Sequence, residues 1–137
     1  MPVFTLIHMK RVTGIGGIFF KADDPEKLKS WYAEHLQLDT DQYGVMFKSR
    51  NLDNPDEVTY LQWGLFKKDT DYFNPSEKPY MINYCVQNLE EIVEEFKKSG
   101  VEVVDEIATY DYGKFVHVMD PEGNKIELWE PIDSAFL

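Results

Sequence analysis

Hydrophobic and polar positions follow the same pattern twice along the chain. In the first copy, an apolar run at 15–20 predicts a strand. Asp24 and Pro25 then have the residue types preferred at the N-cap and the first position of a helix. Apolar residues follow at the three- and four-residue spacing that places them on one helical face. They are Leu28, Trp31, Tyr32 and Leu36.

The second copy begins with a strand-like run at 80–86. Asn88 and Glu91 follow at the spacing of a capping box, and Gly100 is suited to end the helix. A constant offset in residue number places Asp24 on Asn88, so the pattern indicates an internal duplication. The apolar face expected for this second helix comprises Leu89, Ile92, Val93 and Phe96.

Short strand candidates follow each helix. They lie at 44–49 and 58–66 in the first half and at 101–104, 114–119 and 125–130 in the second. A polar segment at 67–79 contains two prolines and predicts the linker between the halves. We therefore predict one α+β domain spanning 1–137, built from two modules of roughly βαβββ type. Module one spans about 10–66, and module two spans 80–131.

The final stretch, "GKFVHVMDPEGNKIELWEP", predicts two strands joined by a turn at 120–124. Side chains alternate along a strand, and one register of this pair groups all the aliphatic residues on one side. In that register His117 lies opposite Glu127 on the other side. Phe115 and Trp129 flank this pair, so an imidazole and a carboxylate face away from the helix together.

The same alternation assigns residues of the other strands to the face of His117 and Glu127. Phe19 and Asn83 are placed there directly by the strand period. For 58–66, the duplication favours Thr59, Leu61 and Trp63 on this face and Gln62 on the other. An aromatic face with few polar groups is typical of a small-molecule site. The candidate ligand-binding residues are Asn83, Trp63, Phe19, Phe115 and Trp129.

The charge and the cysteine content of the chain exclude several classes of partner. The chain has 14 basic and 25 acidic side chains, and its net charge of −11 argues against nucleic acids and anionic membranes as partners. Its single cysteine, Cys85, fits a reducing cytoplasm and is expected to be an inert buried thiol. We read Met9 as a possible second start, with 1–8 as a leader. The expected partner is a small-molecule ligand.

Three segments of the chain resemble the vicinal oxygen chelate superfamily of glyoxalases, bleomycin-resistance proteins and extradiol dioxygenases. They are "DDPEKLKSWYAEHLQL", "MINYCVQNLEEIVEEFKKSGV" and the final "GKFVHVMDPEGNKIELWEP". The resemblance extends over about 12–131. It implies that the two modules form a half-open β-cup and that the protein is a homodimer. In the enzymes of the family it also implies a divalent metal held by His and Glu side chains inside the cup.

Only one of the implied metal-ligand positions is matched. Glu127 occupies the position of the family's metal-binding glutamate. Gly17 and Met81 occupy the positions where the resemblance implies histidines, and the implied carboxylate falls on Thr59 or Leu61. Glycine has no ligand atom, and a thioether is too soft for the ions that these enzymes use. We therefore expect no conventional metal centre, and the cofactor is left open.

Two function classes remain open at this stage. In the first, Glu127 and His117 are catalytic and transfer protons on a carbonyl compound, as in a lyase, an isomerase or a dioxygenase-like enzyme. In the second, the cup sequesters a drug or metabolite without chemistry, as bleomycin-resistance proteins do. A third, structural interpretation makes Glu127 a former ligand satisfied by a local hydrogen bond or ion pair.

Overall fold

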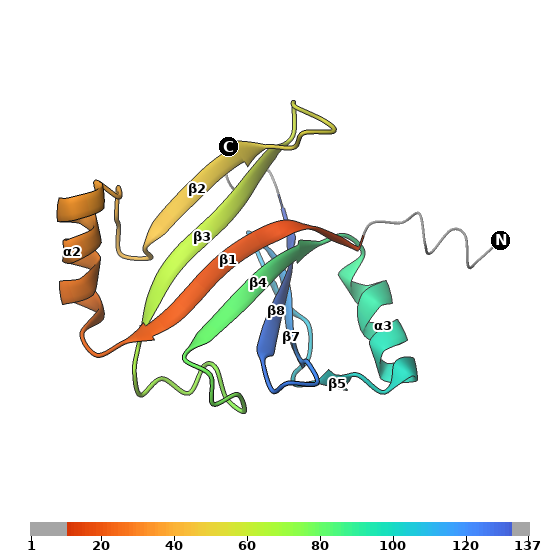
Figure 1. The fold of residues 1–137 in the computed structure, drawn as a ribbon. Coiled ribbons are helices and arrows are strands. Elements are labelled where there is room, and N and C mark those ends of the chain that lie inside the picture. Colours follow the sequence, from red (N-terminus) through yellow and green to blue (C-terminus); the bar gives the residue numbers. More distant parts are fainter. Residues whose placement is uncertain (1–10, 133–137) are drawn as a thin grey trace.

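The computed structural model describes residues 11–132 and has a mixed α+β architecture, with eight strands in one open sheet and two helices (Figure 1). This confirms the predicted fold class, whereas the proposed second start at Met9 lies outside the described residues. No helix within 11–132 is long and apolar enough to cross a membrane. The elements are β1 (Val12–Ala22), α2 (Pro25–Leu36), β2 (Val45–Arg50), β3 (Val58–Lys67), β4 (Tyr80–Val86), α3 (Leu89–Ser99), β5 (Glu102–Val103), β6 (Ala108–Tyr110), β7 (Gly113–Met119) and β8 (Lys125–Pro131).

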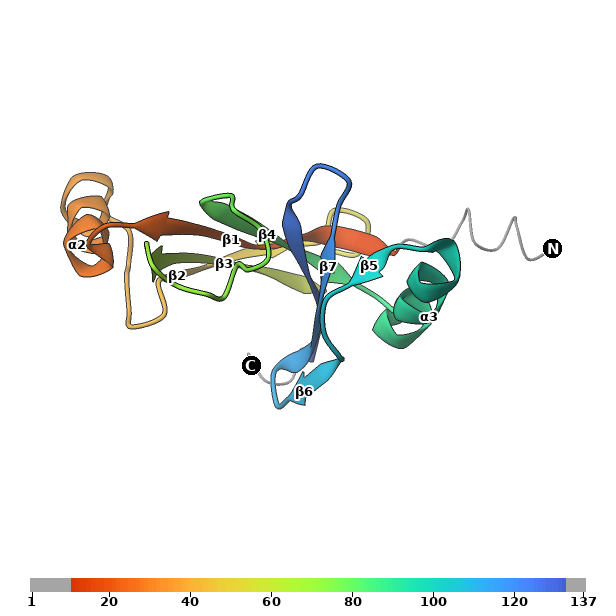
Figure 2. The same ribbon diagram turned by 90° about the horizontal axis from the view of Figure 1, so that it is seen from below.

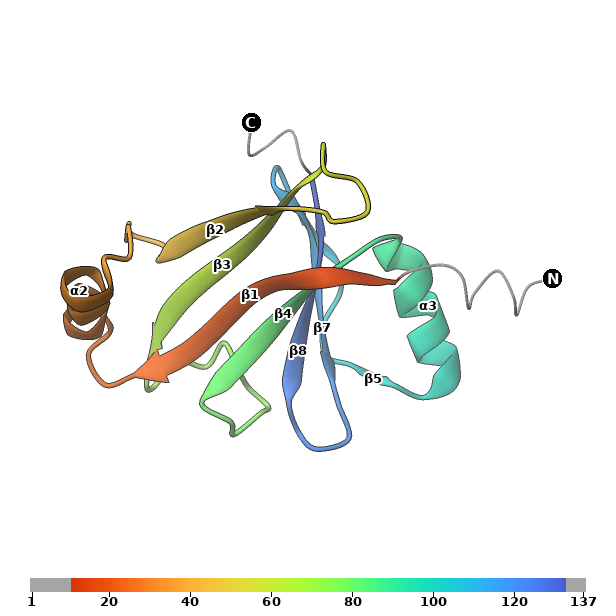
Figure 3. The same ribbon diagram turned by 45° about the horizontal axis from the view of Figure 1, so that its top comes forward.

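The sheet joins the two halves of the chain edge to edge. Its strand order is β2-β3-β1-β4-β8-β7-β5 (Figure 3). Strand β6 pairs with β7. The first strands of the halves, β1 and β4, run antiparallel to each other, and each has a parallel neighbour from its own half, β3 or β8. The same local topology therefore occurs twice. Among the described residues, α2 is followed by two strands and not by the three of a βαβββ unit, and the sequence pattern missed β6.

Helix α3 covers one face of the second half of the sheet. Leu89, Ile92 and Val93 are buried, as the helical pattern predicts, and they pack against Val116 of β7 and Leu128 of β8. Burying each such aliphatic side chain contributes about 1.5–3 kcal/mol. This cluster therefore fixes which face of β7 and β8 is turned away from the helix.

Helix α2 begins as predicted but does not cover the sheet. The Asp24 side chain accepts a hydrogen bond from the Lys27 backbone N–H at 3.1 Å, which is the expected N-cap. None of the α2 side chains is buried, however, and the helix lies beyond one end of the sheet (Figure 2). Trp31 is 49% exposed, and Tyr32 contacts the ring of Trp63 in β3. The amphipathic pattern of this segment would place its apolar face on the sheet, as in α3, but α2 reaches only the end of the sheet.

The N-terminus of α3 has a different cap from the predicted one. Asn88 adopts a left-handed conformation with φ 59°, and its side chain makes no capping hydrogen bond. Instead, Oε1 of Glu130 in β8 accepts a hydrogen bond from the Leu89 backbone N–H at 2.8 Å. The capping box with Glu91 is therefore wrong, since an acceptor from a neighbouring strand replaces the local one. Gly100, with φ 81°, ends the helix as predicted.

The strands β7 and β8 pair in the predicted register. His117 lies opposite Glu127, and Val118 lies opposite Ile126. The parallel pair β4–β8 places Asn83 beside Glu127. One register thus brings an amide, an imidazole and a carboxylate together on the face away from α3.

The predicted face of β3 is wrong by one residue. Pairing with β1 places Gln62 beside Gly17, and Tyr60 packs with Cys85 and Trp129. Trp63 instead contacts the rings of Phe20 and Tyr32, at centroid distances of 5.7 and 4.9 Å. Because strand side chains alternate, a shift of one residue exchanges the two faces of the whole strand.

Candidate functional site

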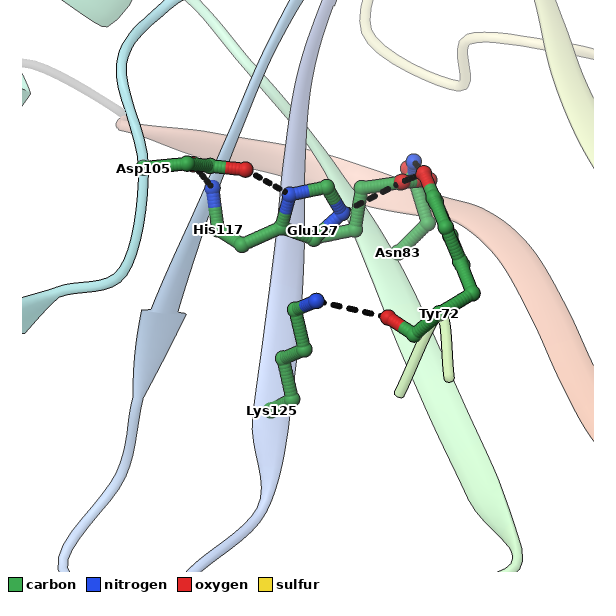
Figure 4. A network of polar contacts seen from close by, with 6 residues as sticks. All are labelled: Tyr72, Asn83, Asp105, His117, Lys125 and Glu127. Atoms are coloured by element: carbon green, nitrogen blue, oxygen red, sulfur yellow. Dashed lines mark hydrogen bonds and ion pairs between the residues drawn. The ribbon is translucent and has the colours of Figure 1, made fainter. Parts of the chain in front are cut away.

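Glu127 lies at the centre of a buried polar network (Figure 4). Its Oε1 accepts a hydrogen bond from Nδ2 of Asn83 at 2.7 Å. Its Oε2 lies 2.5 Å from the hydroxyl of Tyr72 and 2.8 Å from Nε2 of His117. Three partners, from β4, from the segment between β3 and β4, and from β7, therefore converge on one carboxylate of β8.

His117 bridges two carboxylates. Its Nδ1 lies 2.7 Å from Oδ2 of Asp105, on the side of the ring away from Glu127. The other oxygen of Asp105 accepts a hydrogen bond from the His117 backbone N–H at 2.8 Å, so the ring and the main chain are held together. Burial disfavours the charged imidazole, but the hydrogen bonds to Glu127 and Asp105 outweigh burial and raise the pKa of His117 above its ordinary value. The protonated, cationic ring is therefore favoured.

The same network sets the charge state of Glu127. Burial alone would raise its pKa, but hydrogen bonds from His117, Tyr72 and Asn83 lower the pKa of this carboxyl below its ordinary value. Burial and the adjacent Glu127 carboxylate raise the pKa of the Tyr72 hydroxyl. Glu127 is thus an ionised acceptor, and Tyr72 is a neutral donor to it.

The segment between β3 and β4 delivers Tyr72 to this network. Phe73 is fully buried and anchors the segment, while the Tyr72 ring stacks on Phe66 with 5.4 Å between centroids. Nζ of Lys125 donates a hydrogen bond to the Tyr72 main-chain oxygen at 2.6 Å. A segment that its polar composition predicts to be a linker therefore contributes a side chain to the site.

A cavity of about 630 Å³ adjoins Glu127 and Asn83. This volume is in the range of small-molecule sites. Gln62 and Asp111 contribute further polar groups, and no Lys or Arg among the described residues lines the cavity. The aromatic side chains of the wall are Phe19, Tyr43, Tyr112, Phe115 and Trp129.

Two of these aromatic walls meet at an angle. Phe115 and Trp129 stack with 5.7 Å between centroids and 8° between planes. The ring of Tyr112, in the turn between β6 and β7, stands at 69° to Phe115, with centroids 5.6 Å apart. Nε1 of Trp129 donates a hydrogen bond to the Tyr112 main-chain oxygen at 3.0 Å, which ties the turn to the sheet.

Two glycines of β1 allow the close packing behind the cavity. A Cβ atom on Gly16 would lie 2.4 Å from Oδ1 of Asn83 and 2.6 Å from Sγ of Cys85. A Cβ atom on Gly17 would lie 2.7 Å from the ring of Phe19. Both residues are buried, so any side chain here would displace the site residues.

The residues do not fit a conventional metal centre. At Gly17, where the sequence resemblance implies a histidine, the Phe19 ring occupies the space that the side chain would need. Both oxygens of Glu127 are committed to protein partners. Asp105 and Glu127 lie on opposite sides of the His117 ring, and no group of three or more His, Cys, Asp or Glu among residues 11–132 could hold a metal ion.

The structure brings most of the candidate residues from the sequence together. Glu127, Asn83, Phe19, Phe115 and Trp129 line the cavity, and His117 lies directly behind Glu127. Trp63 lies on the opposite face of the sheet, and Gln62 of the same strand lines the cavity in its place. Sequence reasoning missed Tyr72, Asp105 and Asp111 as parts of this region. Tyr72 is distant in sequence from Glu127, and Asp105 lies outside the predicted strands, so the only local signal is the aromatic pair at 72–73 in a polar segment.

Comparisons with known proteins extend these observations. The family model described as Glyoxalase/Bleomycin resistance protein/Dioxygenase superfamily matches residues 14–128. Methylmalonyl-CoA epimerase from Mycobacterium tuberculosis is 19% identical with a TM-score of 0.57, over 95% of this chain and 98% of that one. The Streptomyces coelicolor enzyme, in complex with 2-nitronate-propionyl-CoA, is 14% identical with a TM-score of 0.62, over 88% and 98%.

A superfamily member from Vibrio splendidus 12B01 is 12% identical with a TM-score of 0.55, over 85% of this chain and 97% of that one. At these identities the solved structures establish the likeness of fold alone. The comparison with curated protein sequences finds no significant match.

Proposed function

The chain belongs to the glyoxalase/bleomycin resistance protein/dioxygenase superfamily, and from this premise we propose that it binds a small organic molecule in its cup without a metal ion. One observation carries the proposal. Glu127, where the sequence resemblance implies a metal ligand, has both carboxylate oxygens hydrogen-bonded to Tyr72, Asn83 and His117, while an aromatic cavity of about 630 Å³ lies open beside it. The carboxylate therefore shapes the cavity wall, and the aromatic rings supply most of the contact surface.

Proton transfer is the second candidate, because a continuous hydrogen-bonded row leads from Asp105 through His117 to the cavity-lining Glu127. A general base near neutral pH works best when its pKa lies near the operating pH. The hydrogen bonds to Glu127 lower its pKa and occupy its oxygens, which favours binding over base catalysis. Exchange of a proton next to a carbonyl group, lost in Glu127→Gln, would support the enzyme instead.

The cavity does not suit the substrate of the epimerase neighbours. The ligand of the Streptomyces coelicolor structure is an acyl-CoA and carries phosphate charges. The cavity here is lined by Asp111 and Glu127 and, among the described residues, by no Lys or Arg. Phosphate recognition generally relies on Arg and Lys side chains or on backbone N–H groups.

A neutral fluorescent probe tests the proposal. N-phenyl-1-naphthylamine is titrated into the protein in the presence of EDTA, and fluorescence reports binding. We expect saturable binding of one molecule per chain. Met46→Trp, which fills the cavity from β2, should weaken it at least about tenfold, since overpacking excludes the ligand.

The matched control is Phe47→Trp in the same strand. Phe47 is 42% exposed and does not line the cavity, so probe affinity should remain unchanged. Lack of saturable binding, equal weakening by both substitutions, or binding that EDTA abolishes would each contradict the proposal.

We propose in addition that the protein is a homodimer in a reducing, cytoplasmic environment. The single cysteine supports the environment. The dimer is supported by apolar side chains that the described chain leaves exposed on α2 and β1. They are Trp31, Leu36, Val12, Ile15 and Ile18.

A further inference from the structure

The charges around the cavity are not balanced. Glu127 is compensated by the favoured imidazolium of His117 at 2.8 Å. Asp111 lines the same cavity from the turn between β6 and β7, is exposed, and makes no ion pair within the described part of the chain. The mouth of the cavity therefore has one uncompensated negative charge and, within the same residues, no positive side chain in its wall.

The uncharged part of the wall is also attractive to cations. The face of an aromatic ring carries partial negative charge, and a cation within about 6 Å of its centroid is stabilised. Five aromatic residues line this one cavity. Tyr112 packs edge to face against Phe115 with 5.6 Å between centroids, and Phe115 stacks on Trp129, so these three rings form one continuous aromatic wall.

We infer that the ligand is an organic cation, an ammonium or N-alkylated nitrogen attached to an apolar or aromatic body, and this inference rests on the proposed binding function. The cationic group lies against the aromatic wall beside Tyr112, with Asp111 at the mouth. The apolar body lies deeper, against Phe19 and Trp129. A quaternary nitrogen suits this arrangement because it needs no hydrogen-bond acceptor.

Anionic and hydrogen-bond-rich ligands fit the same wall poorly. An anion would approach Asp111 and the ring faces without a compensating cation. Both oxygens of Glu127 and Nδ2 of Asn83 are engaged in the network, and Nε2 of Gln62 donates hydrogen bonds to the main-chain oxygens of Tyr43 and Trp63. Oδ1 of Asn83 is buried without a hydrogen-bond partner among the described residues, and this acceptor would repel an anion rather than bind it. The wall thus discriminates by charge and shape more than by directional hydrogen bonds.

Two compounds of the same shape test the charge preference. Benzyltrimethylammonium and its neutral isostere neopentylbenzene are each used to displace N-phenyl-1-naphthylamine from the cavity. We expect the cation to compete at least about tenfold more strongly, as a partly desolvated cation–π contact should provide. Asp111→Asn should weaken the cation about two- to fivefold, typical of an exposed charge contact, and leave the neutral compound unchanged.

Matched variants separate the contribution of the Asp111 charge from that of the Tyr112 ring. Glu94→Gln on the exposed side of α3 removes the same charge outside the cavity and should not alter either affinity. Tyr112→Leu should remove most of the preference for the cation, whereas Tyr80→Leu, at a similarly exposed tyrosine outside the cavity, should not. Equal competition by the two compounds would overturn the inference and leave the binding function intact. A probe that does not bind at all would contradict the binding function itself.

Discussion

Replacing His117 by phenylalanine removes both ring nitrogens and keeps a ring of similar size. Glu127 then loses its compensating cation and one of its three hydrogen-bond partners, while Tyr72 and Asn83 remain. Glu127 is only 4% exposed and cannot regain water without opening the sheet face. Asp105 is 43% exposed at its side chain and can be rehydrated.

The expected loss of stability follows from this difference in exposure between Glu127 and Asp105. Removing one partner of a buried ion pair costs about 3–5 kcal/mol, because an uncompensated charge is left behind. The free energy of unfolding of a domain is about 5–15 kcal/mol. The His117→Phe variant should therefore still fold, but with a much smaller free energy of unfolding. Urea unfolding followed by circular dichroism measures this difference. His35→Phe is the control, since the His35 side chain is 53% exposed and should alter stability by less than about 0.5 kcal/mol.

The pH dependence gives a sharper test. The pKa of His117 is raised in the folded protein, so its contribution is complete below the unfolded value of about 6.5 and is lost as pH rises through the folded value. The pKa of Glu127 is lowered, so its contribution is present above about 4.3 and is lost as pH falls through the folded value. The difference between wild type and His117→Phe should therefore be largest near pH 6 and smaller at pH 9. A difference below about 1 kcal/mol, or one that is constant over this range, would refute the reasoning.

Three further outcomes are expected. Glu130→Ala should lower the free energy of unfolding by about 1 kcal/mol in urea titrations, because it leaves the Leu89 N–H at the start of α3 without its acceptor, and Glu130→Gln should retain most of the stability. Gly16→Ala should cost at least about 1–3 kcal/mol by the same assay, since its Cβ would lie 2.4 Å from Asn83 Oδ1, and equal stability would show that β1 has room. Light scattering should give a dimer mass that Trp31→Glu shifts toward the monomer, and a monomeric wild type would refute the dimer.

The sequence predicts the local pairing of the second half well because the relevant information is close together in the chain. The turn at 120–124 and the two-residue period together specify the pairing of His117 with Glu127. The same logic fails for β3, which pairs with the nearby β2 but also lies beside β1, a strand far away in sequence. Its register depends on the parallel contact between Gly17 and Gln62, and no local turn determines that contact. The predicted face of Trp63 is therefore wrong.

The partners of the site were harder to predict than its centre. Glu127 and His117 stand out as polar residues in apolar strands, so periodicity alone identifies them. Tyr72 and Asp105 lie in segments without regular structure, and their positions are determined by tertiary contacts such as the burial of Phe73. The cap of α3 also depends on a tertiary contact, since Glu130 of a distant strand accepts the hydrogen bond expected for the local Asn88 side chain.

A buried carboxylate needs a cation or several hydrogen-bond donors, whatever the function of its site. Where the superfamily resemblance implies a metal ion, this chain supplies the imidazolium of His117 together with the donors Tyr72 and Asn83. Those partners satisfy Glu127 completely, and the charge that they neutralise is no longer available to a ligand. Asp111 then carries the negative charge that a ligand meets, at the mouth of an aromatic cavity. The proposed recognition of an organic cation therefore rests on Asp111 and on the ring faces of the cavity, and not on Glu127.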